Sequence, residues 1–213
     1  MCSSDLMTSP SDCVVIIPAK GMSRRLPRKN LSLCAGVSLV ERAVRCAAQT
    51  KIFEAIVVSS EDQEVLDAVS AIRGGRELVR VFPAHRPSIL SADGVSVAAV
   101  VSYLLAINNY RWEHFCVLWP TSPLRTPEML RAMWRQYDGQ RFKCLHSVYA
   151  RDPTQHDGTA IFMATSIFLR RLSLDYKGDQ VFPVEDALDV NTPEDLAEAE
   201  RRLLAREAQC QSS

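Results

Sequence analysis

Short runs of apolar residues alternate along this chain with longer segments in which apolar residues recur every three or four positions. A short, continuous run rich in β-branched residues predicts a strand that is buried on both faces. The first such run, 13–17, has the sequence CVVII and stops at Pro18. The same pattern predicts further strands at 55–59, 78–82 and 115–119.

The segments between these strands have the apolar spacing and the end signals of helices. In 38–48 the apolar residues fall on one helical face, and Thr126 with Pro127 begins another helix. Ser60 is expected to cap a helix at 61–72, and Thr192 opens the last helix. Helices are also expected at 93–108 and 165–172, loops at 19–37 and 83–92, and later strands at 144–149, 159–163 and 181–184.

Strands that alternate with helices of this length predict an α/β fold, with a doubly wound, mostly parallel sheet and helices on both of its faces. Ligands of such sheets bind beyond the carboxyl ends of the strands. The chain has 213 residues and shows no internal repeat or linker, so a single domain is expected over 13–208. Residues 1–12 and 209–213 are expected to be disordered tails.

Composition and charge exclude several classes of function. The formal net charge is zero at pH 7, which argues against nonspecific binding to nucleic acid or to a membrane, because both need a broad basic face. No stretch approaches the roughly 18 apolar residues of a membrane span, and residues 1–12 lack the pattern of a signal peptide. The 7 cysteines include no C-x-x-C pair and are expected to be buried thiols, so we expect a cytoplasmic protein.

The first segment with evident chemistry directly follows the first strand. Residues 16–30, IIPAKGMSRRLPRKN, hold five cations and no acid. This segment matches neither the glycine-rich phosphate loop nor the dinucleotide fingerprint, so side chains would supply most of the binding to an anion. A triphosphate would suit this charge, and a solvated basic loop is the alternative from these residues alone. The cations are Lys20, Arg24, Arg25, Arg28 and Lys29.

Five segments together resemble the acylneuraminate cytidylyltransferases, which are also called CMP-sialic acid synthetases. IPAKGMSRRLPRKN is similar to the IPARGGSKRIPRKN-type signature of that family. The later segments follow in family order: VVSSED at 57–62, RP at 86–87 with Leu90, Asp93 and Ser96 after it, LWPTSPLR at 118–125, and DVNTPED at 189–195. The resemblance spans 14–200 and implies a Rossmann-like fold of the nucleotide-diphospho-sugar transferase type. Synthetases for 3-deoxy-manno-octulosonic acid share this fold, but their first segment differs more.

The resemblance implies a reaction in which CTP and an acidic 2-keto sugar, sialic acid or a related nonulosonic acid, give a CMP-sugar and pyrophosphate with the help of Mg²⁺. It assigns Lys20, Arg24 and Lys29 to the triphosphate as catalytic residues. It places Ala19, Gly21, Ser23, Asn30, Arg86, Asp93 and Ser96 around the nucleotide. It places Trp119, Thr121, Ser122, Arg125, His156 and Asp157 around the sugar, and Asp189 and Asn191 at the metal.

Several of these residues also have structural interpretations. The PTSP segment at 120–123 has the composition of a turn, and Ser96 is placed to cap a helix. Arg125 either meets a sugar carboxylate or pairs with an acid of the fold. A lone histidine such as His156 is typical of a turn, and Asp189 also suits the start of a helix.

The chain departs from the family pattern in its residue types. Lys20 and Arg24 exchange the usual arginine and lysine, which keeps the charge but changes the hydrogen-bond geometry. Trp119 replaces a glutamine, and an indole cannot copy an amide but can stack on a sugar or base. Asn191 replaces the second metal-associated acid, so we expect weaker binding of magnesium.

The largest departure is a missing segment. Only residues 150–155 separate the strand at 144–149 from His156, where the family has a longer segment that dimerises and closes over the partner's sugar. This leaves the sugar and the oligomeric state open, and a homo-oligomer need not be the family dimer. Two alternative functions are a nucleotidyltransferase with another acceptor and a catalytically weakened nucleotide-binding protein of a surface-sugar pathway.

Overall fold

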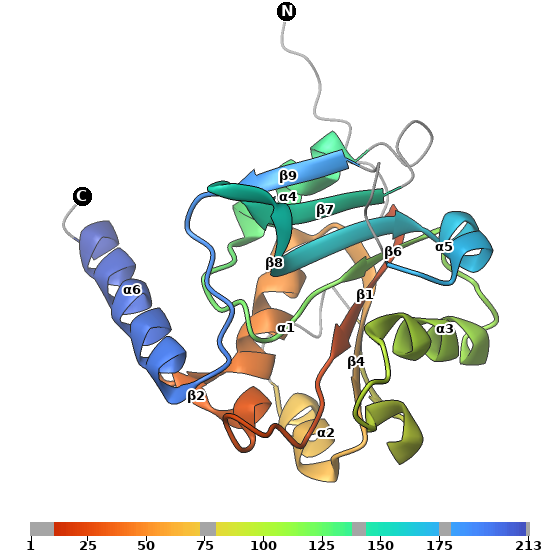
Figure 1. Ribbon diagram of the computed structural model, residues 1–213, viewed down its shortest axis with the longest axis horizontal. Coiled ribbons are helices and arrows are strands. Elements are labelled where there is room, and N and C mark those ends of the chain that lie inside the picture. The colour runs from red at the N-terminus through yellow and green to blue at the C-terminus, as the bar shows by residue number, and fades with distance from the viewer. Residues whose placement is uncertain (1–10, 73–79, 138–143, 175–179, 212–213) are drawn as a thin grey trace, which may run out of the picture.

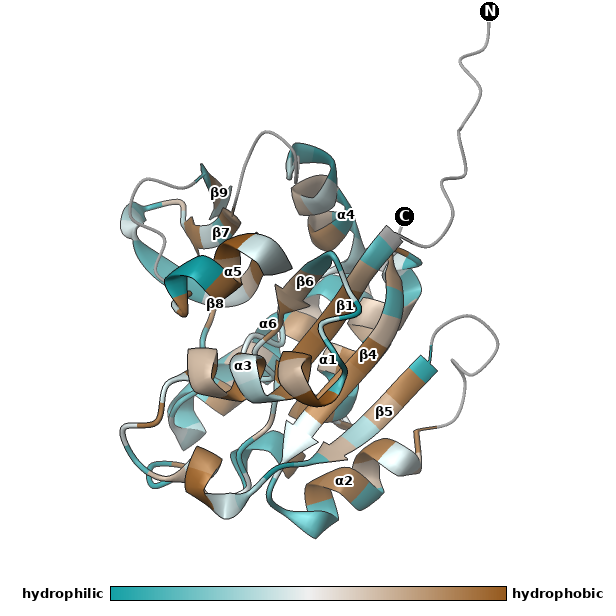
Figure 2. Cartoon of the chain, turned by 90° about the vertical axis from the view of Figure 1, so that its right-hand side faces the viewer, coloured by the Kyte–Doolittle hydropathy of each residue, from teal (hydrophilic) through white to brown (hydrophobic). Residues whose placement is uncertain are grey.

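The computed structural model describes residues 11–72, 80–137, 144–174 and 180–211. Its main sheet consists of β1 (Ser11–Pro18), β4 (Phe53–Ser60), β5 (Arg80–His85), β6 (His114–Val117), β7 (Cys144–Tyr149), β8 (Asp152–Ala164) and β9 (Gln180–Val184). The strand order is β5-β4-β1-β6-β8-β7-β9. Figure 1 shows the part from β4 to β9, and β5 is labelled beside β4 in Figure 2. Strand β8 is antiparallel to both of its neighbours, and every other pair is parallel. The predicted doubly wound, mostly parallel sheet is therefore confirmed.

Helices cover both faces of this sheet. The helices are α1 (Leu39–Thr50), α2 (Gln63–Ser70), α3 (Val97–Ile107), α4 (Pro127–Gln136), α5 (Thr165–Arg171) and α6 (Pro193–Gln211). Val15 packs in one core with residues of α1, α2 and α4, whereas Val14 packs in a second core with residues of α3 and α5. Neighbouring residues of β1 thus point to opposite, covered faces, which explains why its apolar run is continuous. Figure 2 shows this apolar character along β1 and β4, and a mixed pattern along the edge strand β5.

The direction of the strands determines which segments meet at the ligand edge. The chain adds β4 and β5 on one side of β1, and it then adds β6 on the other side. The strand order reverses beside β1, and α/β sheets bind their ligands at the carboxyl ends of strands at such a point. Because β8 runs against the other strands, its first residues lie at this same edge.

Several predicted boundaries differ from the structure, among them the end of the strand expected at 115–119, which stops at Val117, and the three that follow. Asp62 caps α2 instead of Ser60, because its Oδ1 accepts from the Glu64 N–H at 2.9 Å while Ser60 still belongs to β4. The expected loop at 83–92 begins with the last residues of β5, since Pro83 is tolerated in an edge strand, and ends in a 3-10 helix η2 (Ser88–Ser91). Helix α3 begins only after Ser96, whose Oγ accepts from the Ala99 N–H at 3.3 Å.

Other segments contain more regular structure than expected. Strand β8 begins at Asp152 instead of near residue 159, because its polar first half pairs with β7. The expected loop at 19–37 includes a 3-10 helix η1 (Lys29–Leu31) and the hairpin of β2 (Leu33–Cys34) and β3 (Val37–Ser38). Residues 78–79, which were expected to begin a strand, lie outside the described residues.

The ends of the described chain reach into the expected tails. Strand β1 already begins at Ser11, and α6 continues to Gln211, whereas residues 1–10 and 212–213 lie outside the described residues. The limits of the single domain stay a prediction. Among the helices that the structure describes, none combines the length and the apolar character that crossing a membrane requires.

The cysteines of the central strands are buried, as predicted. Cys13, Cys116 and Cys144 have no exposed surface, and Cys34 and Cys46 are also buried. Burial raises the pKa of the Cys46 thiol to about 11, so it stays protonated at neutral pH. We therefore assign these thiols to packing.

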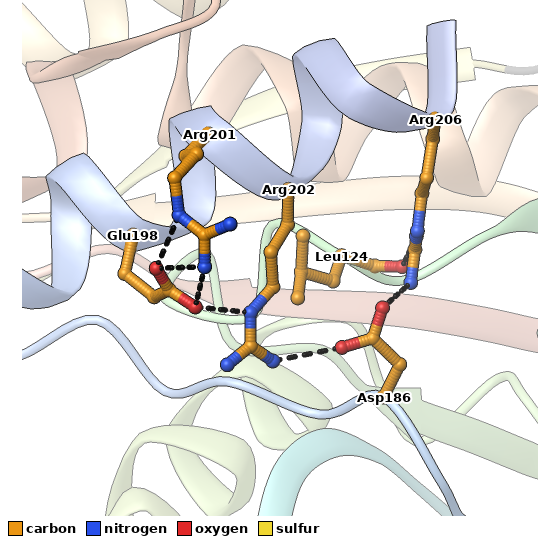
Figure 3. Close-up of polar contacts among 6 residues, drawn as sticks. All are labelled: Leu124, Asp186, Glu198, Arg201, Arg202 and Arg206. Carbon is orange, nitrogen blue, oxygen red and sulfur yellow. Dashed lines mark hydrogen bonds and ion pairs between the residues drawn. The ribbon is translucent and has the colours of Figure 1, made fainter. Parts of the chain in front are cut away.

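Ionic contacts connect α6 with the segments around it (Figure 3). Arg202 and Arg206 both pair with Asp186, which lies between β9 and α6, and Arg202 also donates to Glu198 at 2.6 Å. Arg206 Nη1 donates to the Leu124 carbonyl oxygen at 2.8 Å. Beneath these contacts, Leu203 and Ala199 pack on Leu124 and other apolar residues. The last helix is thus attached to the loop that follows β6.

Candidate functional site

A cavity of about 490 Å³ lies at the ligand edge of the sheet, beside the strand reversal. It is bordered by Pro18 at the end of β1 and by the segments that follow β5, β6 and β9, together with the first half of β8. Ten of the residues that the sequence assigned to the site line this cavity. They are Lys20, Lys29, Asn30, Arg86, Asp93, Trp119, Thr121, His156, Asp189 and Asn191.

The basic loop is held against the end of β4. The Gly21 N–H donates to Glu61 Oε1 at 2.8 Å, and Asn30 Nδ2 donates to the Lys20 carbonyl oxygen at 2.7 Å. A Cβ atom on Gly21 would lie 2.4 Å from the Cβ of Asp62, so only glycine lets the loop approach this closely. These contacts direct the side chains of Lys20 and Lys29 to the cavity.

Opposite charges meet on the wall formed by η1 and the segment after β9. Lys29 Nζ donates to Asn191 Oδ1 at 3.1 Å, and Arg25 Nη2 donates to the same oxygen at 2.9 Å. Asn191 Nδ2 in turn donates to Asp189 Oδ2 at 2.7 Å. Burial lowers the pKa of Lys29, and the nearby Asp189 carboxylate opposes this shift. Lys29 and Asp189, which are 160 positions apart in the sequence, thus share one cavity.

At the mouth of the cavity, Asp93 faces two cations of the basic loop. Lys20 Nζ lies 3.2 Å from Asp93 Oδ1, and Arg24 pairs with the other carboxylate oxygen. The hydrogen bond from Lys20, followed by the charge of Arg24, lowers the pKa of Asp93. All three side chains are well exposed, so water and salt screen these pairs and a stronger anion can replace the carboxylate.

Glu61 is a central residue that the sequence analysis did not assign to the site. It accepts from the Gly21 N–H, from Arg86 Nη2 at 3.0 Å and from Ser91 Oγ. Burial raises the pKa of Glu61, but these hydrogen bonds and the charge of Arg86 outweigh it, so the net pKa is lowered. A signal was present in the sequence, because Glu61 follows directly after a buried strand within the VVSSED segment.

Arg86 lines the cavity with a guanidinium group that is already bonded. Its Nη1 donates to the Ser59 carbonyl oxygen at 3.1 Å, and its Nε donates to Ser91 Oγ at 2.8 Å. Its third nitrogen donates to Glu61, and only 3% of its side chain is exposed. Arg86 therefore fixes the segment after β5 against the end of β4.

Other predicted residues lie in the walls and do not reach the cavity. Arg125 donates to the carbonyl oxygens of Trp119 and Thr159 at 2.6 and 2.9 Å, and it is buried. Asp157 accepts from Ser147 and from the backbone and hydroxyl of Thr159. Of the residues described, the remaining predicted ones outside the cavity lining are Ala19, Gly21, Ser23, Arg24, Ser96 and Ser122.

Trp119 and His156 form the wall on the β8 side. Their rings contact each other edge to face, with centroids 4.9 Å apart and planes at 63°. His156 Nδ1 accepts from the Gly158 N–H at 2.8 Å, and burial lowers the pKa of this histidine. A hydrogen bond of 2.7 Å from the Val190 N–H to the Thr121 carbonyl oxygen joins the loop after β6 to the segment that carries Asp189.

Known proteins with similar sequences have names that refer to the cytidylyl group or to a CMP-linked sugar acid. The pseudaminic acid cytidylyltransferase of Campylobacter jejuni is 32% identical over 133 residues, which are 61% of this chain and 55% of that protein. The CMP-N,N'-diacetyllegionaminic acid synthase of Legionella pneumophila is 33% identical over 121 residues, which are 55% of this chain and 50% of that protein. The chain thus spans about half the length of the curated relatives it matches.

Solved structures give the same fold. A CMP:2-keto-3-deoxy-manno-octonic acid synthetase complexed with CTP superposes with a TM-score of 0.72. The superposition covers 92% of this chain and 100% of that chain, at 17% identity, and it supports the Rossmann-like fold alone. The family model described as cytidylyltransferase matches residues 14–190. This match covers most of the chain and includes the segments that carry the cavity, so the chain belongs to the cytidylyltransferase family.

Proposed function

We propose that this chain transfers the cytidylyl group of CTP to an acidic 2-keto sugar of the nonulosonic acid type. The observation that carries the proposal is the cavity itself, because Lys20, Lys29 and Asp189 all line it at the ligand edge of the sheet. Cations of the loop after β1 close to a carboxylate of the segment after β9 suit a polyphosphate that reacts with the help of a divalent metal. The names of the relatives, which pair a cytidylyl donor with acidic sugars, point to the same chemistry.

The reaction transfers the cytidylyl group through its α-phosphorus. The oxygen of the sugar's anomeric hydroxyl bonds to the α-phosphorus of CTP, and the bond from this phosphorus to the bridging oxygen breaks. The electron pair leaves with pyrophosphate, and the hydroxyl proton passes to solvent. Such a transfer needs positioning and charge neutralisation more than a protein nucleophile. We assign the charge neutralisation to Lys20, Arg24 and Lys29, which lie along one loop.

Before the nucleotide binds, the Asp93 carboxylate occupies the cations that would bind phosphate. Because it pairs with Lys20 and Arg24 at the exposed mouth, phosphate oxygens of CTP would replace its carboxylate on these cations. Gly21, Asn30 and Arg86 keep the loop and the segment after β5 in place around the nucleotide. Ala19 and Ser23 belong to the same loop, and their assignment to the nucleotide rests on the family resemblance.

The residues present fit a magnesium ion that takes most of its ligands from phosphate oxygens. Among the residues that the structure describes, no three His, Cys, Asp or Glu side chains gather into a metal site. Asp189 brings one carboxylate to the cavity, and one or two carboxylates plus phosphates are the usual ligands of magnesium. Asn191 Oδ1 already accepts from Lys29 and Arg25, so it would have to release them to bind metal. When bound, magnesium would neutralise charge on the phosphates.

The sugar is assigned to the wall on the β8 side. Trp119, Thr121 and His156 line the cavity there and offer an aromatic ring and polar groups. Arg125, Ser122 and Asp157 act one layer behind, because their side-chain bonds hold the backbone of this wall. The cytoplasmic location and the oligomeric state stay predictions.

A pyrophosphate-release assay tests the proposal. The native chain with Mg²⁺, a panel of nucleoside triphosphates and a panel of nonulosonic acids should release pyrophosphate with CTP preferred. Replacing Lys29 with Met should lower kcat/KM by about 100-fold, the size expected for removing one stabilising charge from a transition state. The matched control, Arg135→Met on the exposed side of α4, should leave it unchanged.

Two results would change the conclusion. If Lys29→Met and Arg135→Met have equal activities while both remain folded, the basic loop does not bind the reacting phosphates. If CTP binds and no acid on the panel is turned over, the protein is instead a nucleotide-binding protein of a surface-sugar pathway. Asn191, which stands where the family has an acid, is the observation that favours this second function.

A further inference from the structure

The loop after β1 and the segment after β5 meet at two places, one exposed and one more buried. At the exposed mouth of the cavity, the Asp93 carboxylate pairs with Lys20 and Arg24. At the second place, the side chain of Glu61, which directly follows β4, lies between the same two segments. The proposed function places phosphate oxygens on Lys20 and Arg24, so the contact at the mouth is lost when CTP binds, whereas the contact through Glu61 can remain.

Glu61 divides its two carboxylate oxygens between these segments. Its Oε1 accepts from the Gly21 N–H at 2.8 Å, and its Oε2 accepts from Arg86 Nη2 at 3.0 Å and from Ser91 Oγ. Lys20, which is next to Gly21, and Ser91 both line the cavity, whereas Glu61 is not one of the lining residues. Glu61 would therefore act on a ligand through the residues that it binds.

These contacts require a carboxylate. Arg86 has only 3% of its side chain exposed and Glu61 has 16%, so the guanidinium charge is buried beside its partner and depends on it. Every group that bonds to the Glu61 side chain is an N–H or O–H donor, and these donors approach both of its oxygens. An amide has one oxygen and one NH₂ group, so a glutamine would turn a donor toward the donors on one of the two sides.

The backbone of β4 fixes the base of both segments without the help of Glu61. The Ser59 carbonyl oxygen accepts from the Ala19 N–H at 2.9 Å and from Arg86 Nη1 at 3.1 Å. Glu61 instead reaches Gly21 and Ser91, which lie farther along each segment. A chain without this carboxylate should therefore keep its sheet but lose the fixed spacing between the loop and the segment.

We propose that Glu61 is a positioning residue that holds the loop after β1 and the segment after β5 at the spacing that CTP requires. The inference rests on the proposed function, because that function puts the phosphates of CTP on the loop and the nucleoside beside the segment. Once phosphate oxygens replace Asp93 on Lys20 and Arg24, the Glu61 contacts still connect the two segments. The two parts of CTP then bind to one prearranged site.

This role predicts an advantage of CTP over its parts. CMP and pyrophosphate together contain the groups of CTP, and a linked ligand binds more tightly than its parts because the second part binds intramolecularly. The product of the dissociation constants of CMP and pyrophosphate, divided by that of CTP, expresses this advantage as an effective concentration. A change in the spacing lowers the effective concentration even where each part still binds its own segment.

Isothermal titration with each of the three ligands, in the presence of Mg²⁺, measures the effective concentration for the native chain and its variants. Glu61→Gln should lower it by at least about tenfold. The matched control is Glu64→Gln, which makes the same change at an exposed acid that pairs with Arg28 of the same loop. This control should leave the effective concentration unchanged. Equal values in the native chain and in Glu61→Gln would overturn the inference.

A shorter acid separates the effect of spacing from that of charge. Glu61→Asp keeps a negative charge beside Arg86, but its carboxylate is one CH₂ group closer to the backbone and is too short to bond to Gly21 and Ser91 at once. In urea unfolding, Glu61→Asp should be more stable than Glu61→Gln, while its effective concentration should be lowered to a similar extent. This variant also carries the test if Glu61→Gln does not fold. A native effective concentration in Glu61→Asp would mean that Glu61 only neutralises Arg86, and the inference would be wrong.

The titrations need no turnover, so the two proposals can fail separately. If the native chain converts no acidic sugar but its effective concentration falls in Glu61→Gln and Glu61→Asp, the proposed transfer is wrong and the role of Glu61 is supported. If the native chain releases pyrophosphate from CTP and the effective concentration is unchanged in both variants, only the role of Glu61 is wrong. If the native chain does not bind CTP, both proposals fail.

Discussion

The loop after β1 borders the cavity on one side, and the loop after β6 with the start of β8 forms the wall on the β8 side, but these two regions satisfy their polar groups in different ways. Lys20 forms an ion pair with Asp93, and Lys29 donates a hydrogen bond to Asn191. Both partners belong to other segments that line the cavity, so a bound ligand can replace them. Arg125 and Asp157 are buried and bonded to the backbone and side chains of their own wall. Charged residues in family-like segments can therefore bind the ligand or build the wall, and their partners distinguish the two roles.

The largest expected effect is a loss of stability when Arg125, in the wall on the β8 side, is replaced. Arg125→Met would leave the carbonyl oxygens of Trp119 and Thr159 buried without donors, so the free energy of unfolding should fall by about 3 kcal/mol. Arg24→Met removes an exposed charge and should leave stability almost unchanged. Urea unfolding of both variants checks the comparison. Equal stabilities would mean that Arg125 is not a structural residue.

The next largest effect concerns Gly21, which lets the loop after β1 lie close to Asp62, the N-cap of α2. Gly21→Ala places a Cβ against the side chain of Asp62, and the displaced loop should weaken CTP binding by about tenfold, or about 1.4 kcal/mol. Asp62→Gly removes all three of the atoms that the new Cβ meets, and glycine is an acceptable cap. The double variant should therefore bind CTP better than Gly21→Ala alone in a calorimetric titration. If the double variant binds CTP no better than Gly21→Ala, the loss of binding does not come from contact between the new Cβ and Asp62.

A smaller effect concerns the segment after β9. Asn191→Asp replaces the amide that donates to Asp189 with a second carboxylate, and it should tighten magnesium binding in the presence of CTP by about fivefold. Isothermal titration of magnesium measures the change. Asn191→Ser, which shortens the side chain without adding charge, is the control. Equally tight binding in the native chain and in Asn191→Asp would contradict the assignment of this segment to the metal.

The smallest expected effect is at the mouth of the cavity. Asp93→Asn removes the carboxylate that occupies Lys20 and Arg24, and it should strengthen pyrophosphate binding by about two- to threefold at low salt. The gain should decrease as ionic strength rises, since these pairs are exposed. Weaker binding of pyrophosphate would instead show that Asp93 supports the nucleotide site in another way.

The parts of the fold that depend on local pattern were predictable. The run at 13–17 and the Thr126–Pro127 start of α4 depend on residues that are close in sequence, and both are confirmed. The first half of β8 was missed because its residues are polar, and only its pairing with β7 makes it a strand. Propensity is a weak guide where a partner strand decides the structure.

In the site, too, features set by neighbouring residues were predictable, and features set by contacts between distant segments were not. The basic loop was predictable, because its cations follow a strand and match a family segment. The role of Glu61 was not, since its bond to Gly21 joins residues 40 positions apart and depends on how two strand ends meet. The burial of Arg125 was also not predictable, because its acceptors are carbonyl oxygens, which every residue type supplies equally.

The contacts of α6 couple the C-terminal part of the chain to both walls of the cavity. The helix begins two positions after Asn191, and farther along Arg206 holds the Leu124 carbonyl oxygen in the loop after β6. Removing the last turns of α6 would therefore release that loop as well as shorten the helix. Distant substitutions on the outer helix should then alter how the cavity is shaped, although none of them touches a substrate.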